Sequence, residues 1–423
     1  MNVLVIGSGG REHSLCWKIA QSQKCQELYC IPGNGGISKI ANCINLDPSI
    51  KSKIYSFCVR KKIDLVVVGP EDYLEQGLSD YLMKKKINVF GPSKKAAKLE
   101  TSKLFSKKFL KRYKIPTANF KAFNDFKRAK LFIDKNSLPF VIKVDGLASG
   151  KGVFICKTKK EAVSVANDIL INKKFNKAGK KILIEEYLEG FELSYFIFFD
   201  KNNFSIIGYA LDHKRIKDGD IGPNTGGMGA FAPSKKITRD LDKLIQETII
   251  QPTSEGLKKE NLIYRGVLFV GLMITKDGPK VIEYNVRFGD PECQVLMRQY
   301  KSDFLQDTFD VSRDSLTKNK IKMDKDYCVC VVLVSKGYPG RFTKNLEIKN
   351  LSLLKKKKDV EIFHSGTRIE NNKLFSNGGR VLNITSVGNN FYNVRKKILS
   401  IIKELKWKGG FYRRDIGWRV IKK

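Results

Sequence analysis

The first hundred residues alternate between short apolar runs and segments with helical spacing. Apolar runs at residues 2–6, 27–31, 64–68 and 88–90 are each followed by a turn that contains glycine or proline, and residues 12–21 have the spacing of a helix. Continuous apolar strands separated by helices indicate a parallel sheet that is covered on both faces. Ligands bind such open sheets at the carboxyl ends of the strands, so we expect these turns to contribute to a binding site.

Helical and extended patterns continue along the middle of the chain. Residues 96–113 predict one helix, because Lys and apolar residues alternate there at helical spacing. Residues 115–187 predict a smaller α+β unit, with strands at 140–144, 153–156 and 181–186 and a helix at 160–171. The elements expected next are a strand pair within 193–209, a long loop at 212–233, a helix at 238–259, and strands at 264–275 and 279–286.

The last hundred residues predict a compact tail. A polar, Lys-rich segment at 315–326 marks a boundary, and strands at 327–335 and 380–386 and a helix at 391–405 follow it. We therefore expect a multidomain protein that combines α/β and α+β units. The expected domains are an N-terminal open parallel sheet at 1–101, a central domain at 102–324 that contains the smaller unit, and a C-terminal α+β domain at 325–423.

Composition excludes several classes of protein. Apolar residues make up 42% and charged residues 29% of the 423 residues, which argues against a disordered or fibrous chain. The longest apolar run, residues 328–334, is far shorter than the roughly 20 residues that span a bilayer, and the N-terminus lacks the leader of a signal peptide. The nine Cys form no CxxC pair and the three His have no metal-site spacing, so we expect neither a disulfide framework nor a structural zinc site. We expect a cytoplasmic protein.

The chain is strongly basic, because 79 Lys and Arg outnumber 43 Asp and Glu to give a formal charge of +36. A nucleic-acid-binding protein is one interpretation of this charge. The basic residues are spread along the whole chain, however, and no nucleic-acid-binding motif accompanies them. Nucleic acid is therefore not the expected partner. The positive electrostatic field of such a protein would also attract small anionic substrates.

The first strand leads into the loop GSGGRE at residues 7–12. This loop is similar to a dinucleotide-binding fingerprint, but Glu12 stands where the third glycine would allow close packing of helix on strand. The second strand is followed by Pro-Gly-Asn at 32–34 instead of the acid that would bind a ribose. NAD binding is therefore poorly supported. A phosphate site at the helix N-terminus, with Arg11 as a charged contact, is favoured, and a turn without a ligand is the alternative.

A second glycine-rich loop, DGLASGKG at residues 145–152, separates two expected strands. Its glycines are one residue too close for a Walker A loop, and Gly152 occupies the position of the magnesium-binding Ser or Thr. A flexible hairpin with Lys151 at its tip can instead close over a triphosphate as a lid, and Lys143 on the preceding strand directs its charge to the same region. A plain β-turn is the alternative.

Three polar residues alternate with apolar ones in IEYNVR at residues 282–287. In a strand, Glu283, Asn285 and Arg287 share one face. Acid and amide oxygens suit magnesium, and a guanidinium suits a carboxylate or a phosphoryl oxygen. An amphipathic strand with one solvated face is the alternative. The turn FGDPE at 288–292 places two more acids nearby.

The expected loop at 212–233 begins with Asp-His-Lys-Arg and carries five glycines between positions 219 and 229. A long glycine-rich loop inside a compact domain is usually functional. The basic and titratable side chains at 213–215 favour contact with an anion, and a surface connection without a ligand is the alternative.

Together these features resemble an ATP-grasp enzyme: a Lys-bearing strand, the lid sequence SGKG, the segment EEYL at 185–188 and the Glu-x-Asn strand follow in this order. Longer strings narrow the resemblance to the glycinamide ribonucleotide synthetase (phosphoribosylamine–glycine ligase) family, over essentially the whole chain. They are VLVIGSGGREHSL, VVVGPE, IPTANF, KVDGLASGKG, DHKR, GPNTGGMGAFAP, EYNVRFGDPE, SNGGRVL and DIGW. Because the chain ends shortly after Trp418, it resembles the single-function form of the family.

The resemblance implies a central ATP-grasp domain that joins glycine to 5-phosphoribosylamine in purine biosynthesis and cleaves ATP to ADP and phosphate. ATP would lie between the lid at about 115–187 and the rest of the central domain. The implied ATP-binding residues are Lys103, Lys143, Ser149, Gly150, Lys151, Gly152, Glu185, Glu186, Tyr187, Leu188 and Glu192. Glu283 and Asn285 would bind Mg²⁺ or Mn²⁺. The implied catalytic residues are Arg287, which would meet the glycine carboxylate, Asp212 or Asp290, near its amino group, and Lys214.

The remaining implied residues bind substrate, above all phosphoribosylamine. They are Gly9, Gly10, Arg11, Glu12, Gly33, Asn34, Pro70, Glu71, Asn224 and Thr225. In the implied mechanism, phosphoryl transfer makes glycyl phosphate, the amine attacks it, and phosphate leaves. Positioning and charge stabilisation are then sufficient, and no nucleophilic side chain is needed.

The chain departs from the ATP-grasp pattern at one place. Many ATP-grasp enzymes have another acid shortly before the Glu-x-Asn strand, where this chain has VGLM at 270–273. A second metal ion would therefore be held differently or be absent. Another ATP-grasp carboxylate–amine ligase is the alternative function, and we expect a monomer or a weak homodimer.

Overall fold

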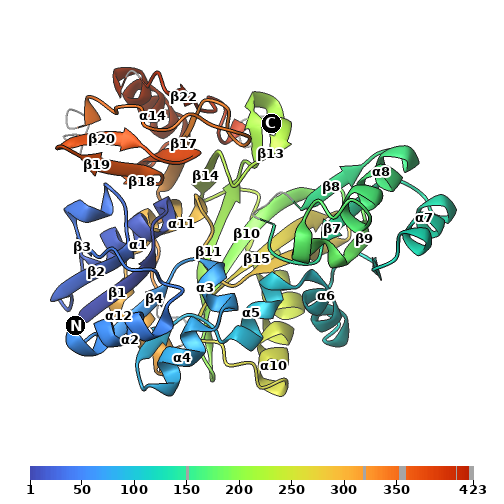
Figure 1. Cartoon of the computed structure of the whole chain (residues 1–423), viewed down its shortest axis with the longest axis horizontal. Coiled ribbons are helices and arrows are strands. Elements are labelled where there is room, and N and C mark those ends of the chain that lie inside the picture. The colour runs from blue at the N-terminus through green and yellow to red at the C-terminus, as the bar shows by residue number, and fades with distance from the viewer. Residues whose placement is uncertain (149–151, 318–320, 352–358, 406, 419–423) are drawn as a thin grey trace.

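The computed structural model describes residues 1–148, 152–317, 321–351, 359–405 and 407–418. Its strands form three main sheets and two small two-stranded ones. In Figure 1 the N-terminal unit (blue) and the C-terminal strands (orange and red) lie on one side of the molecule, and the small sheet that contains β7, β8 and β9 (green) projects on the other. No helix in these ranges is long and apolar enough to cross a membrane.

The N-terminal sheet is open and parallel, as the apolar runs predict, with the order β3-β2-β1-β4-β5. Its strands are β1 (Asn2–Gly7), β2 (Glu27–Pro32), β3 (Asn42–Cys43), β4 (Leu65–Val68) and β5 (Asn88–Phe90). The connecting helices are α1 (Gly10–Ile19), η1 (Ile37–Lys39), α2 (Lys51–Arg60), α3 (Glu71–Glu75) and α4 (Leu78–Lys84). Leu4 and Val5 of β1 belong to different cores, which explains why this strand is apolar on both faces. The two-residue strand β3 is too short for the apolar pattern to predict.

The prediction of one helix over residues 96–113 is wrong, because two helices occupy this segment. α5 covers Lys94–Thr101 and α6 covers Lys103–Arg112, and Ser102 between them is extended, with φ −133° and ψ 109°. The Ser102 hydroxyl accepts a hydrogen bond from the N–H of Phe105 and so caps α6. A serine side chain can replace a helical hydrogen bond with a bond of its own to the backbone. The spacing of apolar residues does not show where this happens, so it cannot predict the break between α5 and α6.

The small sheet is antiparallel, with the order β6-β9-β7-β8. Its elements are β6 (Phe120–Phe123), α7 (Phe126–Lys135), β7 (Phe140–Val144), β8 (Val153–Cys156), α8 (Lys159–Leu170), η2 (Asn176–Lys180) and β9 (Ile182–Glu186). Its apolar side chains, among them Ile142, Ala162 and Ile182, form a core of their own. The unit is therefore the predicted mixture of helices and strands, packed apart from the rest of the chain.

A nine-stranded antiparallel sheet forms the centre of the molecule. Its order is β16-β15-β10-β11-β14-β17-β21-β18, and β22 pairs with β17. The strands are β10 (Phe191–Phe199), β11 (Phe204–Asp212), β14 (Gly229–Ala232), β15 (Gly266–Thr275), β16 (Gly278–Asn285), β17 (Tyr327–Ser335), β18 (Val360–His364), β21 (Arg380–Gly388) and β22 (Gly410–Phe411). Through the pairing of β14 with β17, one hydrogen-bonded sheet joins the central and C-terminal parts of the chain.

The prediction of a loop over residues 212–233 is partly wrong. The segment contains β12 (Arg215–Lys217), η3 (Asp218–Asp220), β13 (Ile221–Asn224) and β14. These short, glycine-containing strands lack the apolar alternation that identifies a strand, and long-range pairing alone makes them extended.

Helices cover the sheets. They are α9 (Arg239–Ile245), the π-helical turn η4 (Gln246–Ile250), α10 (Gln251–Lys259), α11 (Glu292–Gln299), α12 (Phe304–Ser312) and α14 (Phe391–Leu405), and a hairpin of β19 (Thr367–Glu370) and β20 (Lys373–Ser376) completes the C-terminal part. α9, η4 and α10 follow one another directly, in place of the single helix predicted at 238–259. α11 packs on α1, where the Ser14 hydroxyl lies 3.3 Å from the Cys293 sulfur. This contact fixes the N-terminal unit beside the turn that follows β16.

Candidate active site

A cavity of about 470 Å³ lies where the small sheet, the central sheet and the two terminal units meet. Side chains from β7, β9, β15 and β16 line it, together with residues from the N- and C-terminal units. The predicted site residues in its wall are Arg11, Glu71, Lys103, Lys143, Gly152, Glu185, Glu186, Tyr187, Leu188, Glu192, Asp212, Lys214, Asn224, Thr225, Glu283, Asn285, Arg287 and Asp290. Residues that are far apart in the sequence therefore meet in one place.

One end of the cavity holds a buried carboxylate between two lysines. Oε2 of Glu185 lies 2.9 Å from Nζ of Lys107 and 3.0 Å from Nζ of Lys143, and Lys143 also donates a hydrogen bond to the Ile282 carbonyl. Burial lowers the pKa of Lys107 to about 8, although Glu185 opposes this shift. The other carboxylate oxygen of Glu185, Oε1, is buried and has no hydrogen-bond partner among the described residues. The cluster offers an acceptor for an N–H donor and cationic side chains for an anion.

The residues that follow Glu185 form the rim of this end. Glu186 turns away, because its carboxylate accepts hydrogen bonds from the backbone and side-chain amides of Asn119. Tyr187 is 39% exposed, and Glu192 pairs with Lys214 at 3.4 Å. The rim is therefore more polar and more open than the cluster at Glu185.

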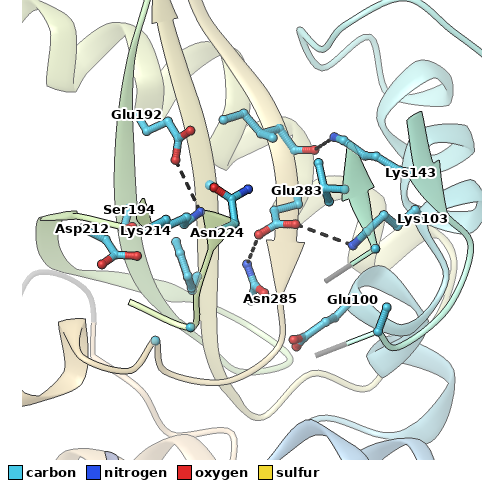
Figure 2. A pocket seen from close by; sticks show the side chains of 18 of the residues that line it. Glu100, Lys103, Lys143, Glu192, Ser194, Asp212, Lys214, Asn224, Glu283 and Asn285 are labelled. Carbon is cyan, nitrogen blue, oxygen red and sulfur yellow. Dashed lines mark hydrogen bonds and ion pairs between the residues drawn. The ribbon is translucent and has the colours of Figure 1, made fainter. Parts of the chain in front are cut away.

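Glu283 and Asn285 lie side by side at the centre of the cavity (Figure 2). The Asn285 amide donates a 3.3 Å hydrogen bond to Oε1 of Glu283, and Oε2 of Glu283 lies 3.6 Å from Nζ of Lys103. Burial alone would raise the pKa of Glu283, but Lys103, Lys214 and Lys143 hold it at about 2. Glu283 is therefore ionised at neutral pH.

These two residues fit a magnesium or manganese ion that is shared with phosphates. The ionised carboxylate and the amide oxygen are hard donors, and magnesium commonly takes one or two protein ligands and fills its other positions with phosphate and water. Among the described residues, no group of three or more His, Cys, Asp and Glu could hold a metal ion alone. The additional acid of many ATP-grasp enzymes is missing here, and Gly271 stands in that segment. Gly271 of β15 pairs with Glu283 of β16, and a Cβ added to Gly271 would lie 3.2 Å from Cγ of Glu283. The small residue thus makes room for the Glu283 side chain.

Two further carboxylates, those of the half-buried Asp212 and the buried Glu292, line the cavity beside Lys214 (Figure 2 labels Asp212 and Lys214). Burial raises the pKa of each carboxyl, and the charge of Glu292 raises the pKa of Asp212 further. Glu292 also accepts a 3.1 Å hydrogen bond from the Ser194 hydroxyl. Nearby Glu192 raises the pKa of Lys214. This acidic region suits a substrate ammonium group.

Asn224 and Thr225 lie beside Lys214, because β13 pairs with β12. The N–H and the hydroxyl of Thr225 both donate to the Lys214 carbonyl at 2.8 Å. The hairpin thus brings the segment around Asn224 back to the cavity wall.

Arg287 sits between two carboxylates at the other end of the polar row. Its Nε donates to Oε2 of Glu71 at 3.0 Å, and its Nη2 lies 2.7 Å from Oε1 of Glu100. Burial alone would raise the pKa of Glu71, but Arg287 and Arg11 hold it at about 2. Burial raises the pKa of Glu100 to about 7.

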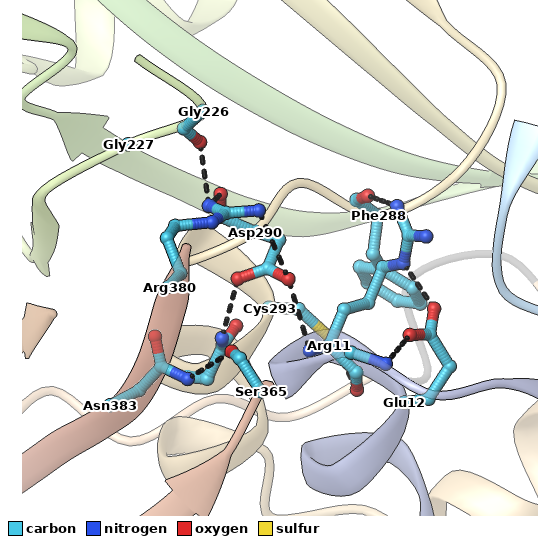
Figure 3. A network of polar contacts seen from close by, with 12 residues as sticks. Arg11, Glu12, Gly226, Gly227, Phe288, Asp290, Cys293, Ser365, Arg380 and Asn383 are labelled. Atoms are coloured by element: carbon cyan, nitrogen blue, oxygen red, sulfur yellow. Dashed lines mark hydrogen bonds and ion pairs between the residues drawn. The ribbon is translucent and has the colours of Figure 1, made fainter. Parts of the chain in front are cut away.

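Arg11 and Glu12 form a pair at the start of α1 (Figure 3). Nε of Arg11 donates to Oε1 of Glu12 at 2.6 Å, and its Nη1 donates to the Phe288 carbonyl at 3.0 Å. The second oxygen of Glu12 accepts a 2.6 Å hydrogen bond from the Gly9 N–H and so caps the helix. The Glu12 carboxylate therefore accepts a hydrogen bond from a backbone N–H of the glycine-rich loop, whereas in a dinucleotide-binding fold this part of the loop is free to bind the pyrophosphate.

Asp290 connects three parts of the chain (Figure 3). Its Oδ2 lies 3.4 Å from Nη2 of Arg380 and accepts a 3.4 Å hydrogen bond from the Arg11 N–H, and its Oδ1 accepts a bond from Gln294. Arg380 also donates to the carbonyls of Gly226 and Asp290. Burial alone would raise the pKa of Asp290, but Arg380 and Arg11 lower it.

Some predicted substrate-binding residues do not line the cavity. They are Gly9, Gly10, Glu12, Gly33, Asn34 and Pro70. The Asn34 side chain accepts a hydrogen bond from the Gly36 N–H and donates to the carbonyls of Ser8, His364 and Ser365. It thus ties the N-terminal loops to the C-terminal strands, and its role toward a substrate stays a prediction. Ser149, Gly150 and Lys151 lie outside the described residues.

Three family models match consecutive parts of the chain. They are described as phosphoribosylglycinamide synthetase, N domain, at residues 1–100; the ATP-grasp (A) domain at 101–293; and the C domain at 328–419. The chain belongs to the phosphoribosylglycinamide synthetase family. The family resemblance and the ATP-grasp fold that the sequence predicts are thereby confirmed.

Relatives in this family cover the chain from end to end. The phosphoribosylamine–glycine ligase of Mesorhizobium japonicum is 45% identical over 421 residues, which are 100% of this chain and 99% of that protein. The trifunctional purine biosynthetic protein adenosine-3 of Gallus gallus is 45% identical, and the match covers 99% of this chain and 42% of that protein.

Solved structures agree with this assignment. The crystal structure of phosphoribosylamine–glycine ligase from Thermotoga maritima superposes with a TM-score of 0.85 at 34% identity and covers 98% of this chain and 100% of that one. The biotin carboxylase domain of 2-oxoglutarate carboxylase from Hydrogenobacter thermophilus has a TM-score of 0.70 at 16% identity, covers 97% of this chain and 96% of that one, and shares the fold.

Sequence reasoning did not assign a role to four residues of the cavity region: Glu100, Lys107, Glu292 and Arg380. The sequence does place Glu292 near the site, because the turn FGDPE follows the row of Glu283, Asn285 and Arg287 directly. Lys107 follows Lys103 by one helical turn, a spacing that would have identified it once α6 was separated from α5. Glu100 lies in no motif that the sequence singles out. Arg380 stands in the string SNGGRVL, which carries the family resemblance but does not indicate that the fold brings this arginine to the cavity.

Proposed function

We propose that the chain joins glycine to 5-phosphoribosylamine, with cleavage of ATP to ADP and phosphate. The observation that carries this proposal is the row Glu283, Asn285 and Arg287, which lines the same cavity as the lysines at Glu185 and the acidic pair of Asp212 and Glu292. A ligase that activates a carboxylate with ATP needs this sequence of sites: a phosphate site, a metal site, a carboxylate site and an amine site. Membership of the phosphoribosylglycinamide synthetase family supports glycine and phosphoribosylamine as the substrates.

ATP occupies the end of the cavity between the small sheet and β16 in this proposal. Lys103 and Lys143 contact its phosphates, and the loop at 145–152 closes over them. Oε1 of Glu185, which has no hydrogen-bond partner among the described residues, supports a contact to the exocyclic amine of adenine. Glu186, Tyr187 and Leu188 would lie at the rim of this end, and Glu192 would lie near the ribose. Closure would exclude water from an intermediate that water hydrolyses.

Glu283 and Asn285 would hold Mg²⁺ or Mn²⁺. When bound there, the ion would neutralise phosphate charge and orient the terminal phosphoryl group. The chain supplies the ionised carboxylate, and Lys103 at 3.6 Å keeps it in place.

Glycine lies between Arg287 and the acidic pair. Arg287 has N–H groups left for a carboxylate after its contacts with Glu71, Glu100 and the Phe288 carbonyl. Asp212 with Glu292 favours the ammonium group, whereas Asp290 is already committed to Arg380 and Gln294. Between Asp212 and Asp290, the geometry thus favours Asp212, with Lys214 beside it.

The reaction proceeds in two displacements. An oxygen of the glycine carboxylate bonds to the γ-phosphorus of ATP as the bond to ADP breaks, and glycyl phosphate forms. The amine nitrogen of phosphoribosylamine then bonds to the carbonyl carbon, the C–O bond to phosphate breaks, and phosphate leaves with that electron pair and takes up the proton that the amine loses. Lys143, Lys103 and Arg287 stabilise the charges and hold the reacting groups in line.

Phosphoribosylamine approaches from the N-terminal unit in this proposal. Arg11 and Glu71 of that unit line the cavity and support this placement, and Asn224 and Thr225 line it from the hairpin beside Lys214. Gly9, Gly10, Glu12, Gly33, Asn34 and Pro70 stay predicted residues for this substrate. The cytoplasmic location and the monomeric or weakly dimeric state also stay predictions.

ADP release by the purified protein tests the proposal. Magnesium and ATP are supplied, and glycine and freshly generated phosphoribosylamine are added singly and together. We expect ADP to form when both substrates are present, in equal amount with glycinamide ribonucleotide. ADP release that depends on another amine or carboxylate would indicate a different ATP-grasp ligase. No turnover with any pair, together with tight, salt-sensitive binding to RNA or DNA, would favour the nucleic-acid alternative.

A further inference from the structure

Glu100 is a buried carboxylate in the cavity wall that the proposed reaction leaves without a role. It lies in the last turn of α5, and 6% of the residue is exposed. Its Oε1 lies 2.7 Å from Nη2 of Arg287, and its Oε2 accepts a 2.7 Å hydrogen bond from the N–H of Val286. Both oxygens therefore hold consecutive residues just beyond the end of β16.

The same short segment holds the nucleotide side of β16. Lys103, three residues after Glu100, pairs with Glu283 at 3.6 Å. Between them, the Ser102 hydroxyl donates a 3.0 Å hydrogen bond to Asp145 at the start of the glycine-rich loop. Two contacts, one at Glu283 and one at Arg287, thus fix residues 283–287 relative to α5 and α6. Figure 2 shows Glu100 and Lys103 on the same side of Glu283 and Asn285.

Arg287 has a limited number of donors, which makes its orientation important. A guanidinium carries five N–H groups in a rigid plane. Nε donates to Glu71, Nη1 to the Phe288 carbonyl, and Nη2 faces Glu100. Two N–H groups remain, enough for one carboxylate. The bonds from Nε and Nη1 hold two nitrogens of this plane, and Glu100, at 2.7 Å from Nη2, holds the third.

We propose that Glu100 is a positioning residue that fixes the plane of Arg287 and sets its distance from the nucleotide contacts of Glu283 and Lys103. This inference rests on the proposed function, because it takes Arg287 as the residue that meets the glycine carboxylate. Glu100 touches neither substrate. It acts through Arg287, because it orients the two remaining N–H groups of the guanidinium toward the glycine carboxylate. Misplacement of a reacting carboxylate by a fraction of an ångström is enough to slow such a transfer severely.

Glu100→Gln tests the proposal with little change in shape. The amide has one oxygen, so it can accept from the Val286 N–H or from Arg287 but not from both. We expect the KM for glycine to rise about tenfold or more and kcat to fall, while the KM for ATP stays within about twofold of the wild-type value. Glu260→Gln is the matched control, because it removes a Glu–Arg pair, with Arg112, at the C-terminal end of α6, the helix that follows α5. This control should leave all kinetic constants unchanged.

Glu100→Asp separates positioning from fold stability. It keeps the charge on a shorter side chain, so its KM for glycine should lie between those of the wild type and Glu100→Gln. Unchanged glycine kinetics in Glu100→Gln would overturn the proposal. Equal losses toward ATP and glycine, or failure of both variants to fold, would assign Glu100 to fold stability and overturn it as well. If the wild-type protein itself forms no glycinamide ribonucleotide, it is the proposed function that fails, so the two failures are distinguishable.

Discussion

Arg380 of β21 and Asp290 of the turn after β16 face each other across the cavity wall, with Nη2 and Oδ2 3.4 Å apart. Ninety residues separate them in the sequence. The pair, with the additional bond from Arg380 to the Gly226 carbonyl, attaches the C-terminal unit to the turn that follows the row of Glu283, Asn285 and Arg287. The C-terminal unit therefore contributes to the cavity directly.

Arg380→Ala should destabilise the protein by about 2 kcal/mol, because it removes the guanidinium that faces the largely buried Asp290 carboxylate and leaves that charge only its hydrogen bonds to Gln294 and the Arg11 N–H. We also expect a lower kcat/KM for phosphoribosylamine, since Asp290 holds the start of α1 through the Arg11 N–H. Urea unfolding and steady-state kinetics measure both effects. The exposed pair of Lys397 and Asp359 offers the control, and Lys397→Ala should change stability by less than about 1 kcal/mol. Equal effects of the two variants would contradict the assigned importance of the Arg380 pair.

Lys143→Ala and Glu283→Ala should each abolish ADP formation while the fold is retained. In the proposed function, Lys143 contacts the phosphates of ATP, and Glu283 would be an ionised ligand of the metal ion. ADP release with both substrates present measures the loss, and circular dichroism checks the fold. Lys130→Ala, in the exposed helix α7, is the matched lysine control and should remain fully active. Full activity in both site variants would refute the assignment of the ATP site.

Gly271→Ala should weaken the response to magnesium, because the added Cβ would lie 3.2 Å from Cγ of Glu283 and displace its carboxylate. We expect the magnesium concentration for half-maximal activity to rise about tenfold, which corresponds to about 1.4 kcal/mol. Activity is measured as a function of magnesium at saturating ATP and glycine. Excess magnesium should restore most of the activity, and a loss that no magnesium concentration reverses would argue against this explanation.

Asn34→Ala distinguishes a substrate-binding residue from a structural one. The Asn34 side chain joins Ser8 to the carbonyls of His364 and Ser365, so we expect its loss to destabilise the protein by about 2 kcal/mol. The KM for phosphoribosylamine should change by less than about threefold if these bonds are its main role. Chemical unfolding and substrate titration provide the two measurements. A large rise in that KM with unchanged stability would support the sequence-based assignment of Asn34 to the substrate.

Glu71 should make stability fall as the solution becomes acidic. Its pKa in the folded protein is about 2, below the value of about 4.3 in an unfolded chain, so the unfolded state takes up the proton first. Its contribution, on the order of 2–3 kcal/mol, is fully present above about pH 4.3 and is lost as the pH falls toward 2. Glu71→Gln should therefore be less stable at pH 7 and show a shallower decline between pH 5 and 3 in urea unfolding. Parallel curves for the two proteins would contradict this role.

Local pattern was sufficient for the central row of the site. Alternation in residues 282–287 places Glu283, Asn285 and Arg287 on one face, and all three line the cavity. Continuous apolar runs likewise predicted the parallel N-terminal sheet. The alternation in residues 282–287 and these apolar runs both depend only on neighbours within a few residues.

Other features depend on contacts that no local pattern reports. Ser102 divides two helices because its hydroxyl caps the second one, although the surrounding apolar spacing is continuous. Glu100 and Arg380 reach the cavity only after sheets from different parts of the chain have assembled. Their partners, Arg287 and Asp290, belong to the row and turn that the sequence identified, but charge alone does not select which distant residue will pair with them.

The position of β14 in the central sheet has a consequence for synthesis of the chain. β14 pairs with β11 on one side, but its partner on the other side, β17, begins about 95 residues later. While the ribosome makes the intervening segment, the outer edge of β14 has unpaired backbone groups, and such edges favour association between chains. Until β17 has been synthesised, the outer edge of β14 can therefore pair with a strand of another molecule. Pairing of β14 with β17 removes this free edge.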